Sequence, residues 1–455
     1  MAITLTKEAI NRPGFDIDEE NKLVFEGCRL EDLASNYGTP NYVFSENIIR
    51  EKCREHIKAF DKCNIDYEVL YAGKAFLVQA MAHILNEEGM SLDASSGGEI
   101  YMALEGGFPA ERIYFHGNNK SKEEIYFALE KNIGTIIIDN LCELELVEQI
   151  ASILNKRANI MVRIIPGVDA NTHEKIRTGQ VDSKFGIPIQ DFLNFFPAII
   201  AKKHLIYQGI HCHIGSQLLN MQFYHLAARE MIEMIKSIEE NYKVKTNMLN
   251  LGGGLGVRYT QEDVPLSISE YVIQLVDRVK EICHEKQLAV PKILVEPGRA
   301  IIAEAGITLY TIGAIKEIKG LKKYLIVDGG MADNPRPSLY DARYEALIVN
   351  KFAMKPSETV TVAGRYCESG DVLIENISLP RAECGDLMVF FTTGAYHYAM
   401  SSNYNGFPRP PVILANNGKH GLMVQGETYQ YLNQNHVIPD WLQQNRNKYN
   451  GNNSK

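Results

Sequence analysis

The sequence predicts an α/β fold in which a TIM-like (β/α)8 barrel is followed by a mostly antiparallel β domain, either a β-sandwich or a β-barrel. From about residue 40 to 310, short β-branched apolar runs alternate with segments of helical periodicity. Beyond about residue 310, short apolar runs are separated by Gly, Pro and Asn turns, which is typical of antiparallel sheets. A chain of 455 residues is too long for one hydrophobic core, so two domains are expected.

The barrel prediction depends on the regular return of strands. Repeated β-then-α patterning over about 270 residues matches the usual size of a (β/α)8 barrel, about 250 residues. A doubly wound sheet is the alternative. Polar, Gly-rich residues fall just after the apolar runs, where barrel enzymes build their sites, and this favours the barrel. The candidate strands are 67–73, 134–140, 159–165, 206–214, 247–253 and 292–298, and the helix candidates include 76–89 and 267–286.

The second domain is expected to join the two ends of the chain. Its candidate strands are 309–318, 323–330, 358–364 and 386–396. The first 40 residues also have strand character, so we expect residues 1–40 and 311–455 to form the β domain and residues 41–310 to form the barrel. The polar tail from Gln444 is expected to be disordered.

Composition and charge favour a small molecule as the partner. The net charge of −9 is spread without a basic stripe, which argues against nucleic-acid binding. No apolar run approaches the roughly 18 residues that span a bilayer, which argues against a membrane protein. Eight cysteines without a C-x-x-C pair, in a chain without a basic-then-apolar leader, indicate free thiols in a reducing cytoplasm.

Lys74 ends an apolar strand in the segment YEVLYAGKAF, where a buried charge is costly. It could be an ordinary lysine that extends its amine to the surface. Alternatively, partial burial lowers its pKa, so that the amine can form an imine with an aldehyde. This segment alone does not decide between the two.

His211 and His213 lie on one face of the predicted strand in GIHCHIGSQ, because side chains alternate along a strand. The pair could be half of a metal site, which needs further ligands from other strand ends. Alternatively, one imidazole lies flat on an aromatic cofactor while Ser216 and nearby backbone N–H groups bind an anion. For His211, an ordinary buried histidine is the simpler interpretation.

Two further strand ends carry groups suited to a phosphorylated ring. The loop GGGLG at 252–256 exposes backbone N–H groups that can converge on phosphate oxygens, although many such loops are ordinary turns. In VEPGRAI, Glu296 can pair with a protonated ring nitrogen and Arg299 can bind a carboxylate or phosphate. A structural ion pair between Glu296 and Arg299 is the alternative.

The predicted β domain contributes polar loops at 328–344, 364–373 and 394–410. Taken singly, each is an ordinary Gly/Pro/Asn loop. Arg336 and Tyr340 could nevertheless converge on a carboxylate. Glu368 could face an ammonium group, and Cys367 could serve as an acid.

Seven of these segments occur together in one order. They are YAGKAF, GIHCHIGSQ, GGGLG, EPGR, DNPRPSLY, CESGD and GAYHYAMSSNYNG. In this order they resemble the PLP-dependent (pyridoxal phosphate-dependent) decarboxylases of the alanine racemase-like fold, and most closely the diaminopimelate decarboxylases. The resemblance covers nearly the whole chain. Any one segment could arise by chance, whereas seven in register are highly specific.

The resemblance implies cofactor roles for residues at the barrel strand ends. Lys74 would hold PLP as a Schiff base, and His213 would stack on the pyridine face. Glu296 would keep the pyridine nitrogen protonated, which deepens the electron sink that the cofactor provides. The residues implied to hold the phosphate and ring are Ser216, Gly253, Gly254, Gly298, Arg299 and Tyr396.

It also implies roles in substrate binding and proton transfer. Cys367 would return a proton to Cα, a role that suits a thiol whose pKa lies near the operating pH. The residues implied to bind the substrate are Arg299, Arg336, Tyr340, Glu368 and Tyr396. Members of the family are homodimers with shared active sites, so Cys367 and Glu368 would act on the partner's cofactor.

The reaction implied is decarboxylation of meso-2,6-diaminopimelate to L-lysine and CO2, the last step of lysine biosynthesis, without a metal. One alternative is a decarboxylase of the same fold that acts on another D-amino acid or a polyamine precursor. An inactive regulatory relative and a metal-dependent hydrolase are the others. His397 stands where the family usually has a small or amide residue, which bears on substrate preference. The composition of the polar loop 172–183 permits closure over the site.

Overall fold

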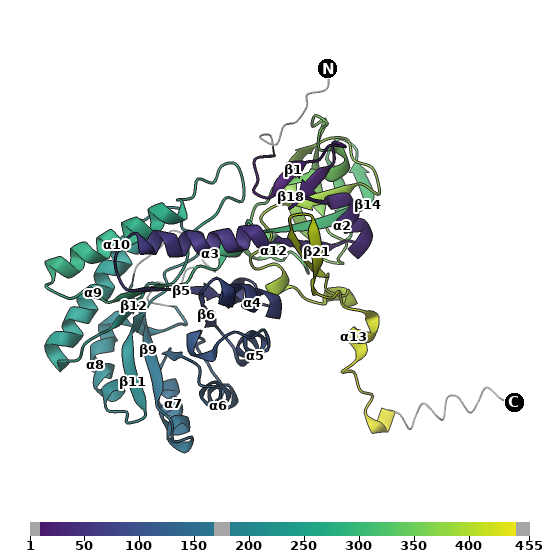
Figure 1. The fold of residues 1–455 in the computed structure, drawn as a ribbon. Helices are drawn as coiled ribbons and strands as arrows, with labels where there is room; N and C mark the ends of the chain where they lie inside the picture. The colour runs from purple at the N-terminus through teal and green to yellow at the C-terminus, as the bar shows by residue number, and fades with distance from the viewer. Residues whose placement is uncertain (1–9, 168–182, 443–455) are drawn as a thin grey trace.

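The computed structural model describes residues 10–167 and 183–442 (Figure 1). Within these ranges, parallel strands close into a barrel, with β13 pairing with β5 through Ile293 and Tyr67. The short strand β10 (Ile187–Pro188) pairs with β9. The barrel strands are β5 (Tyr67–Ala72), β6 (Ser91–Ala94), β7 (Ile113–Phe115), β8 (Thr135–Ile138), β9 (Ala158–Ile165), β11 (Leu205–His211), β12 (Met248–Asn250) and β13 (Lys292–Val295). The predicted barrel is therefore confirmed.

Helices cover the outside of the barrel (Figure 1). In α10, buried residues recur every three or four positions, from Ile268 to Cys283, and Ser267 forms a capping box with Glu270 at its start. The apolar stripe therefore faces the barrel while the polar residues face water. The outer helices are α3 (Glu46–Asp61), α4 (Gln79–Glu87), α5 (Gly97–Glu105), α6 (Lys122–Glu130), α7 (Leu141–Ile153), α8 (Ile189–Ile200), α9 (Gln222–Tyr242) and α10 (Ile268–Glu285).

A second sheet forms the core of the β domain. Most of its strand pairs are antiparallel, while β15–β17 and β4–β20 are parallel. Its strands are β4 (Asn41–Ser45), β14 (Gly306–Ile318), β15 (Lys322–Val327), β16 (Ala346–Ile348), β17 (Glu358–Ala363), β18 (Val372–Leu379), β19 (Leu387–Phe390), β20 (Val412–Asn416) and β21 (Lys419–Val424). This architecture confirms the predicted fold class.

The N-terminal strands form a small sheet of their own. β1 (Phe15–Ile17), β2 (Leu23–Phe25) and β3 (Cys28–Arg29) are followed by α2 (Leu30–Tyr37). The Gly418 N–H donates to the backbone carbonyl oxygen of Glu26 at 2.7 Å, so this sheet is bonded to the β20–β21 turn.

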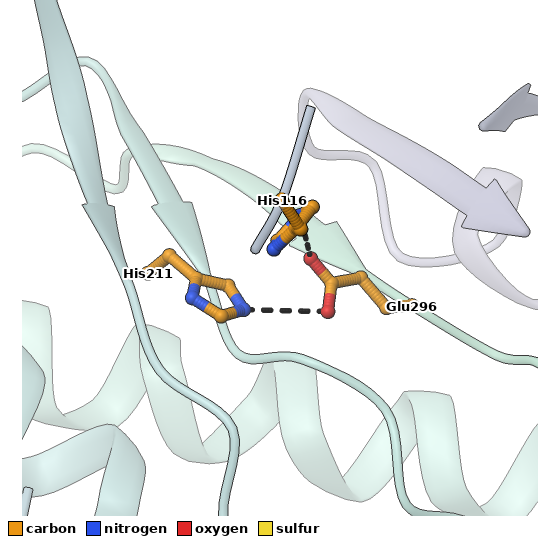
Figure 2. Close-up of side chains that lie close together, drawn as sticks. All are labelled: His116, His211 and Glu296. Atoms are coloured by element: carbon orange, nitrogen blue, oxygen red, sulfur yellow. Dashed lines mark hydrogen bonds and ion pairs between the residues drawn. The ribbon is translucent and has the colours of Figure 1, made fainter. Parts of the chain in front are cut away.

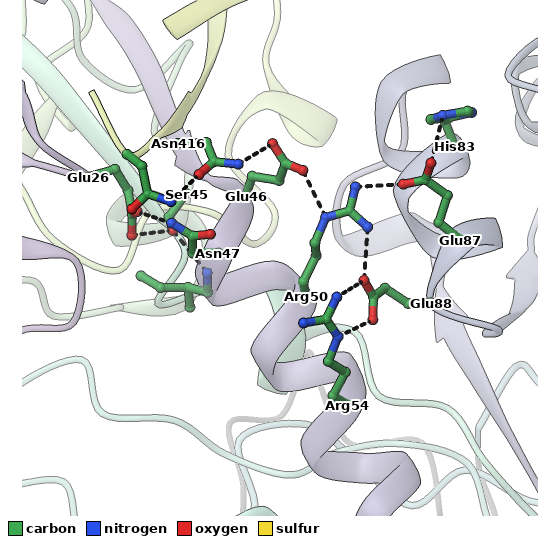
Figure 3. A network of polar contacts seen from close by, with 12 residues as sticks. Glu26, Ser45, Glu46, Asn47, Arg50, Arg54, His83, Glu87, Glu88 and Asn416 are labelled. Atoms are coloured by element: carbon green, nitrogen blue, oxygen red, sulfur yellow. Dashed lines mark hydrogen bonds and ion pairs between the residues drawn. The ribbon is translucent and has the colours of Figure 1, made fainter. Parts of the chain in front are cut away.

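Helix α3 is bound at one end to the β domain and along its length to α4 (Figure 3). At its start, the Glu26 carboxylate accepts hydrogen bonds from Ser45 and Asn47, each at 2.6 Å. One turn later, Arg50 lies 2.8 Å from Glu88, whose side chain is only 6% exposed. Because this pair is largely shielded from solvent, we expect it to contribute more than an exposed ion pair does.

The strand pairing refines the expected domain boundaries. A division at residues 40 and 310 assigns β4 to the barrel, whereas β4 pairs with β14 and β20 in the second sheet. β14 also begins at Gly306, before the expected boundary. The predicted loop 172–183 (apart from Ser183) and the tail from Gln444 lie outside the described residues. In the part of the chain that the structure covers, no helix is both long and apolar enough to cross a membrane.

Candidate active site

The inside of the barrel contains an apolar layer with a polar layer next to it. The apolar layer consists of Leu70, Tyr114, Ile137, Met161 and Leu294. Side chains alternate along a strand, so the residue two positions later points to the same interior, nearer the carboxyl end. Those residues are Ala72, His116, Asp139, Arg163 and Glu296, all of them buried. The barrel therefore gathers charged groups at its carboxyl end, where barrel enzymes place their active sites.

Glu296 is at the centre of this polar layer (Figure 2). Its Oε1 lies 3.0 Å from His116 Nε2 and accepts a hydrogen bond from the Asn250 amide at 2.7 Å. Its Oε2 lies 3.3 Å from His211 Nε2. Burial alone would raise the pKa of Glu296, but His211 and His116 outweigh it and hold the pKa well below the usual range. Glu296 is therefore a buried carboxylate that stays ionised.

The two histidines beside Glu296 support this carboxylate. Burial lowers the pKa of His211 to about 4, so His211 is neutral near pH 7. His116 was missed by the sequence analysis, although it directly follows the apolar strand β7. One ligand atom each from His116, His211 and Glu296 lies within 4.8 Å of the others, which is close enough for a metal ion. The structure thus groups His211 with His116, and not with His213 as the metal-site hypothesis expected.

Lys74 lies in a short turn, Gly73–Ala75, directly after β5. Its side chain is exposed to solvent although both flanking residues are buried. The protein atoms around the amine limit its hydration, which lowers the pKa of Lys74, but Asp93, Tyr396 and Glu296 raise it, and the net shift is upward. The expectation of a lowered pKa is therefore wrong, because two carboxylates face the amine.

Glycines shape the loop after β12. A Cβ at Gly253 would lie 2.1 Å from the backbone carbonyl oxygen of Glu296, and Gly254 has a φ of +115°, so both positions favour glycine. The Gly253 N–H donates to His213 Nδ1 at 3.2 Å, so this nitrogen carries no proton. Burial and the nearby Lys74 lower the pKa of His213 well below its usual value, which agrees with a neutral ring.

Hydrogen-bond donors converge near this loop. Within the described ranges, no residue accepts a hydrogen bond from the N–H groups of Gly254, Gly298 or Arg299. Ser216 Oγ accepts a hydrogen bond from Arg299 Nη2 at 2.8 Å. Unused N–H groups beside a hydroxyl and a guanidinium form a binding site for an anion such as phosphate. The donor set fits the phosphate of PLP.

Arg299 and Arg336 form a cationic pocket lined by tyrosines. Arg299 donates to the Tyr259 hydroxyl, and Arg336 donates to Tyr344 at 2.6 Å. Both guanidinium carbons face the Tyr259 ring, at 5.6 Å for Arg299 and 5.0 Å for Arg336. Both arginines are buried, and neither forms a salt bridge with a carboxylate among the described residues. Two buried positive charges in this arrangement are suited to bind an anionic group.

Tyr396 links this pocket to Lys74. Its N–H donates to the Ala75 oxygen at 2.8 Å, and its ring lies 4.9 Å from the Arg299 guanidinium carbon. His397 is buried and packs edge-on against Tyr344 at 5.2 Å. Tyr259 and Tyr344, like His116, were missed because an isolated tyrosine in a sequence gives no signal of what it contacts. Tyr340, which ends α12 (Arg336–Tyr340), is half-buried.

Cys367 and Glu368 lie on the loop between β17 and β18 of the β domain. Both are exposed, and the Cys367 N–H donates to Asn405 Oδ1 at 2.8 Å. Glu368 Oε1 accepts from the Gly370 N–H at 3.3 Å. Among the described residues, neither side chain forms a hydrogen bond or ion pair with Lys74 or with the arginine pocket.

Comparisons with known proteins identify the family. The family model described as the pyridoxal-binding domain of pyridoxal-dependent decarboxylases matches residues 47–303. The chain is 45% identical to the diaminopimelate decarboxylase of Bacillus subtilis over 400 residues, 88% of this chain and 91% of the relative. The chain belongs to the diaminopimelate decarboxylase family. It is a PLP-dependent carboxy-lyase, as the sequence predicted.

Solved structures agree with this family membership. The diaminopimelate decarboxylase of M. jannaschii in complex with L-lysine is 31% identical, with a TM-score of 0.88 over 95% of this chain and 99% of that chain. The Helicobacter pylori enzyme complexed with L-lysine is 30% identical, with a TM-score of 0.81 over 89% of this chain and 98% of that chain. A lysine/ornithine decarboxylase from Vibrio vulnificus is 24% identical and shares the fold.

Proposed function

We propose that the residues described above decarboxylate meso-2,6-diaminopimelate to L-lysine and CO2, the last step of lysine biosynthesis. The observation that supports this substrate best is the pocket of Arg299 and Arg336. A substrate with a second carboxylate would pair with these buried guanidinium groups, whereas lysine or ornithine would leave them unpaired. The two relatives solved with L-lysine support the same product class.

The fit of PLP rests on the converging donors and the ionised Glu296. When bound, PLP supplies an electron sink that makes loss of CO2 from an amino acid possible. Lys74 would hold the aldehyde carbon, and His213 would lie against the ring. Glu296, kept charged by His116 and His211, would hold a proton on the ring nitrogen. The phosphate would be bound by Ser216, Gly254, Gly298 and Arg299, and Gly253, whose N–H donates to His213, would shape the loop beside it.

Proton return would come from a second copy of the chain. Cys367 and Glu368 are exposed, and among the described residues neither side chain is bonded to Lys74 or to the arginine pocket, which supports a homodimer with shared sites. In that arrangement Cys367 of one subunit donates a proton to Cα at the partner's site. Glu368 faces the substrate's distal ammonium group, while Tyr340 and Tyr396 line the pocket beside the arginines.

We also propose a cytoplasmic location, no nucleic-acid partner, and a division into a barrel and a β domain in which β4 and the whole of β14 belong to the β domain. All eight cysteines are free thiols, which suits a reducing compartment. The net charge of −9 disfavours association with nucleic acid.

An assay of product formation tests the proposed reaction. With PLP, the purified chain is expected to release one CO2 and one L-lysine per meso-diaminopimelate. We expect its kcat/KM for D-lysine to be lower by roughly 10⁴-fold, since the far-end arginines would stay unpaired. Release of CO2 from D-lysine or D-ornithine, with none from meso-diaminopimelate, would show that the substrate assignment is wrong.

A further inference from the structure

Two loops of the β domain are joined by buried aspartates. Asp333 Oδ1, on loop 328–335, accepts a hydrogen bond from the Tyr366 hydroxyl of loop 364–371 at 3.1 Å. In the opposite direction, Asp371 Oδ1 accepts from the Met331 N–H at 2.6 Å. Each aspartate therefore receives a donor from the other loop. The exposed fractions of Asp333 and Asp371 are 1% and 3%.

The contact between the loops is close. A Cβ at Gly364 would lie 2.2 Å from an Asp371 oxygen and 2.5 Å from Gly330 Cα. Asp371 Oδ2 also accepts from the Tyr366 N–H at 2.8 Å, so both ends of Tyr366 are held. These two hydrogen bonds fix both the backbone and the side chain of Tyr366.

Asp333 is a costly residue to bury. Burial raises its pKa to about 7, while hydrogen bonds from Tyr310 and Tyr366 act in the opposite direction. Among the residues the structure covers, no Lys or Arg forms a salt bridge with it. Three donors satisfy this carboxyl group, namely the hydroxyls of Tyr310 and Tyr366 and the Gly330 N–H, so Asp333 is held firmly between the two loops.

The position of this aspartate in the chain indicates that role. Asp333 precedes Arg336 of the cationic pocket by three residues, and Tyr366 is bonded directly to Cys367. The Cys367 N–H is held separately by Asn405. The pair Asp333–Tyr366 therefore connects the segment that leads to Arg336 with the loop that carries the thiol.

We propose that Asp333 and Tyr366 are positioning residues whose hydrogen bond fixes Cys367 at the height and angle from which it delivers its proton. The inference rests on the proposed function, in which Cys367 is the proton donor. In the reaction the bond from Cα to the carboxylate carbon breaks, CO2 leaves, and a new C–H bond forms with the proton of the thiol. With the hydrogen bond lost, the thiol no longer meets one face of Cα, and solvent protonates both faces.

Two matched substitutions test the proposal in D2O. Tyr366→Phe and Tyr310→Phe each remove one hydroxyl from the same carboxyl group, but Tyr366 alone belongs to the Cys367 loop. For Tyr366→Phe we expect kcat to fall about tenfold, with KM changed less than about twofold, because only the proton donor is misplaced. The deuterium on the ε-carbon of the product lysine is expected in both configurations. Tyr310→Phe is expected to keep a single configuration and a normal kcat.

A Tyr366→Phe protein with a normal kcat and deuterium in a single configuration would overturn the proposal. It would also be overturned if Tyr366→Phe and Tyr310→Phe lowered kcat and stereospecificity equally at equal melting temperatures. Cys367→Ala separates the positioning role of Tyr366 from the proton-donor role of Cys367. Loss of kcat and of stereospecificity in Cys367→Ala, with both kept in Tyr366→Phe, would contradict the positioning role alone. If Cys367→Ala keeps both its kcat and its stereospecificity, the proton-donor assignment is contradicted, and the positioning role with it.

Discussion

Lys74→Ala is expected to lower the rate of CO2 release from meso-diaminopimelate by roughly 10⁴-fold or more, because the covalent attachment of PLP is lost. The imine absorbance of the purified protein should disappear with it. Lys74→Arg is the matched control, since it keeps a cation facing Asp93 and Glu296 but cannot form an imine. Both variants should be inactive.

The lysine that carries PLP can be identified by mass spectrometry. Borohydride reduction of the wild-type protein, followed by digestion and mass spectrometry, should place the cofactor on the peptide that contains Lys74. Attachment to another lysine, or an active Lys74→Arg protein, would refute the assignment of Lys74.

Arg336→Met is expected to lower kcat/KM for meso-diaminopimelate by roughly 10³-fold while changing the value for D-lysine little. Arg336 is buried against Tyr259 and Tyr344, and it is the arginine of the pocket that has no contact with Ser216. Its loss should therefore remove recognition of the distal carboxylate without disturbing the phosphate site. Steady-state kinetics with both substrates measures the effect.

Arg343→Met provides the control for this substitution. Arg343 lies seven positions later and forms an exposed pair with Glu262. Its replacement should leave both kcat/KM values unchanged. An equal loss for meso-diaminopimelate and D-lysine in Arg336→Met would mean that Arg336 serves the fold or the cofactor, and not the far end of the substrate.

Much of the barrel and its polar residues could be predicted from the sequence because the signals are local. Apolar runs followed by a polar or glycine residue mark Lys74 and Glu296 at the ends of β5 and β13, which lie close to the predicted strands. His213 was expected on the same strand as His211, but β11 ends at His211 and His213 lies in the loop that follows. β4 was misplaced for a related reason. Three apolar residues in the buried strand Asn41–Ser45 resemble any barrel strand, and only the pairing of this strand with β14 and β20 shows where it belongs.

Other features depend on contacts between distant segments. The pKa of Lys74 is raised by Asp93 and Glu296, which come from other strands, so its own surroundings in the sequence give the wrong sign. His116 follows a strand of three residues, which is too short to give a clear alternation. Tyr259 owes its importance to two arginines that lie far from it along the chain.

Each active site is expected to use Lys74 of one chain and Cys367 of another. Lys74→Ala and Cys367→Ala, each inactive alone, should regain about one quarter of the wild-type activity when equal amounts are unfolded together and refolded. Random pairing makes half of the dimers mixed, and each mixed dimer then has one intact site of two. No recovery, with mixed dimers shown to be present, would mean that both residues act within the same chain and would contradict the account.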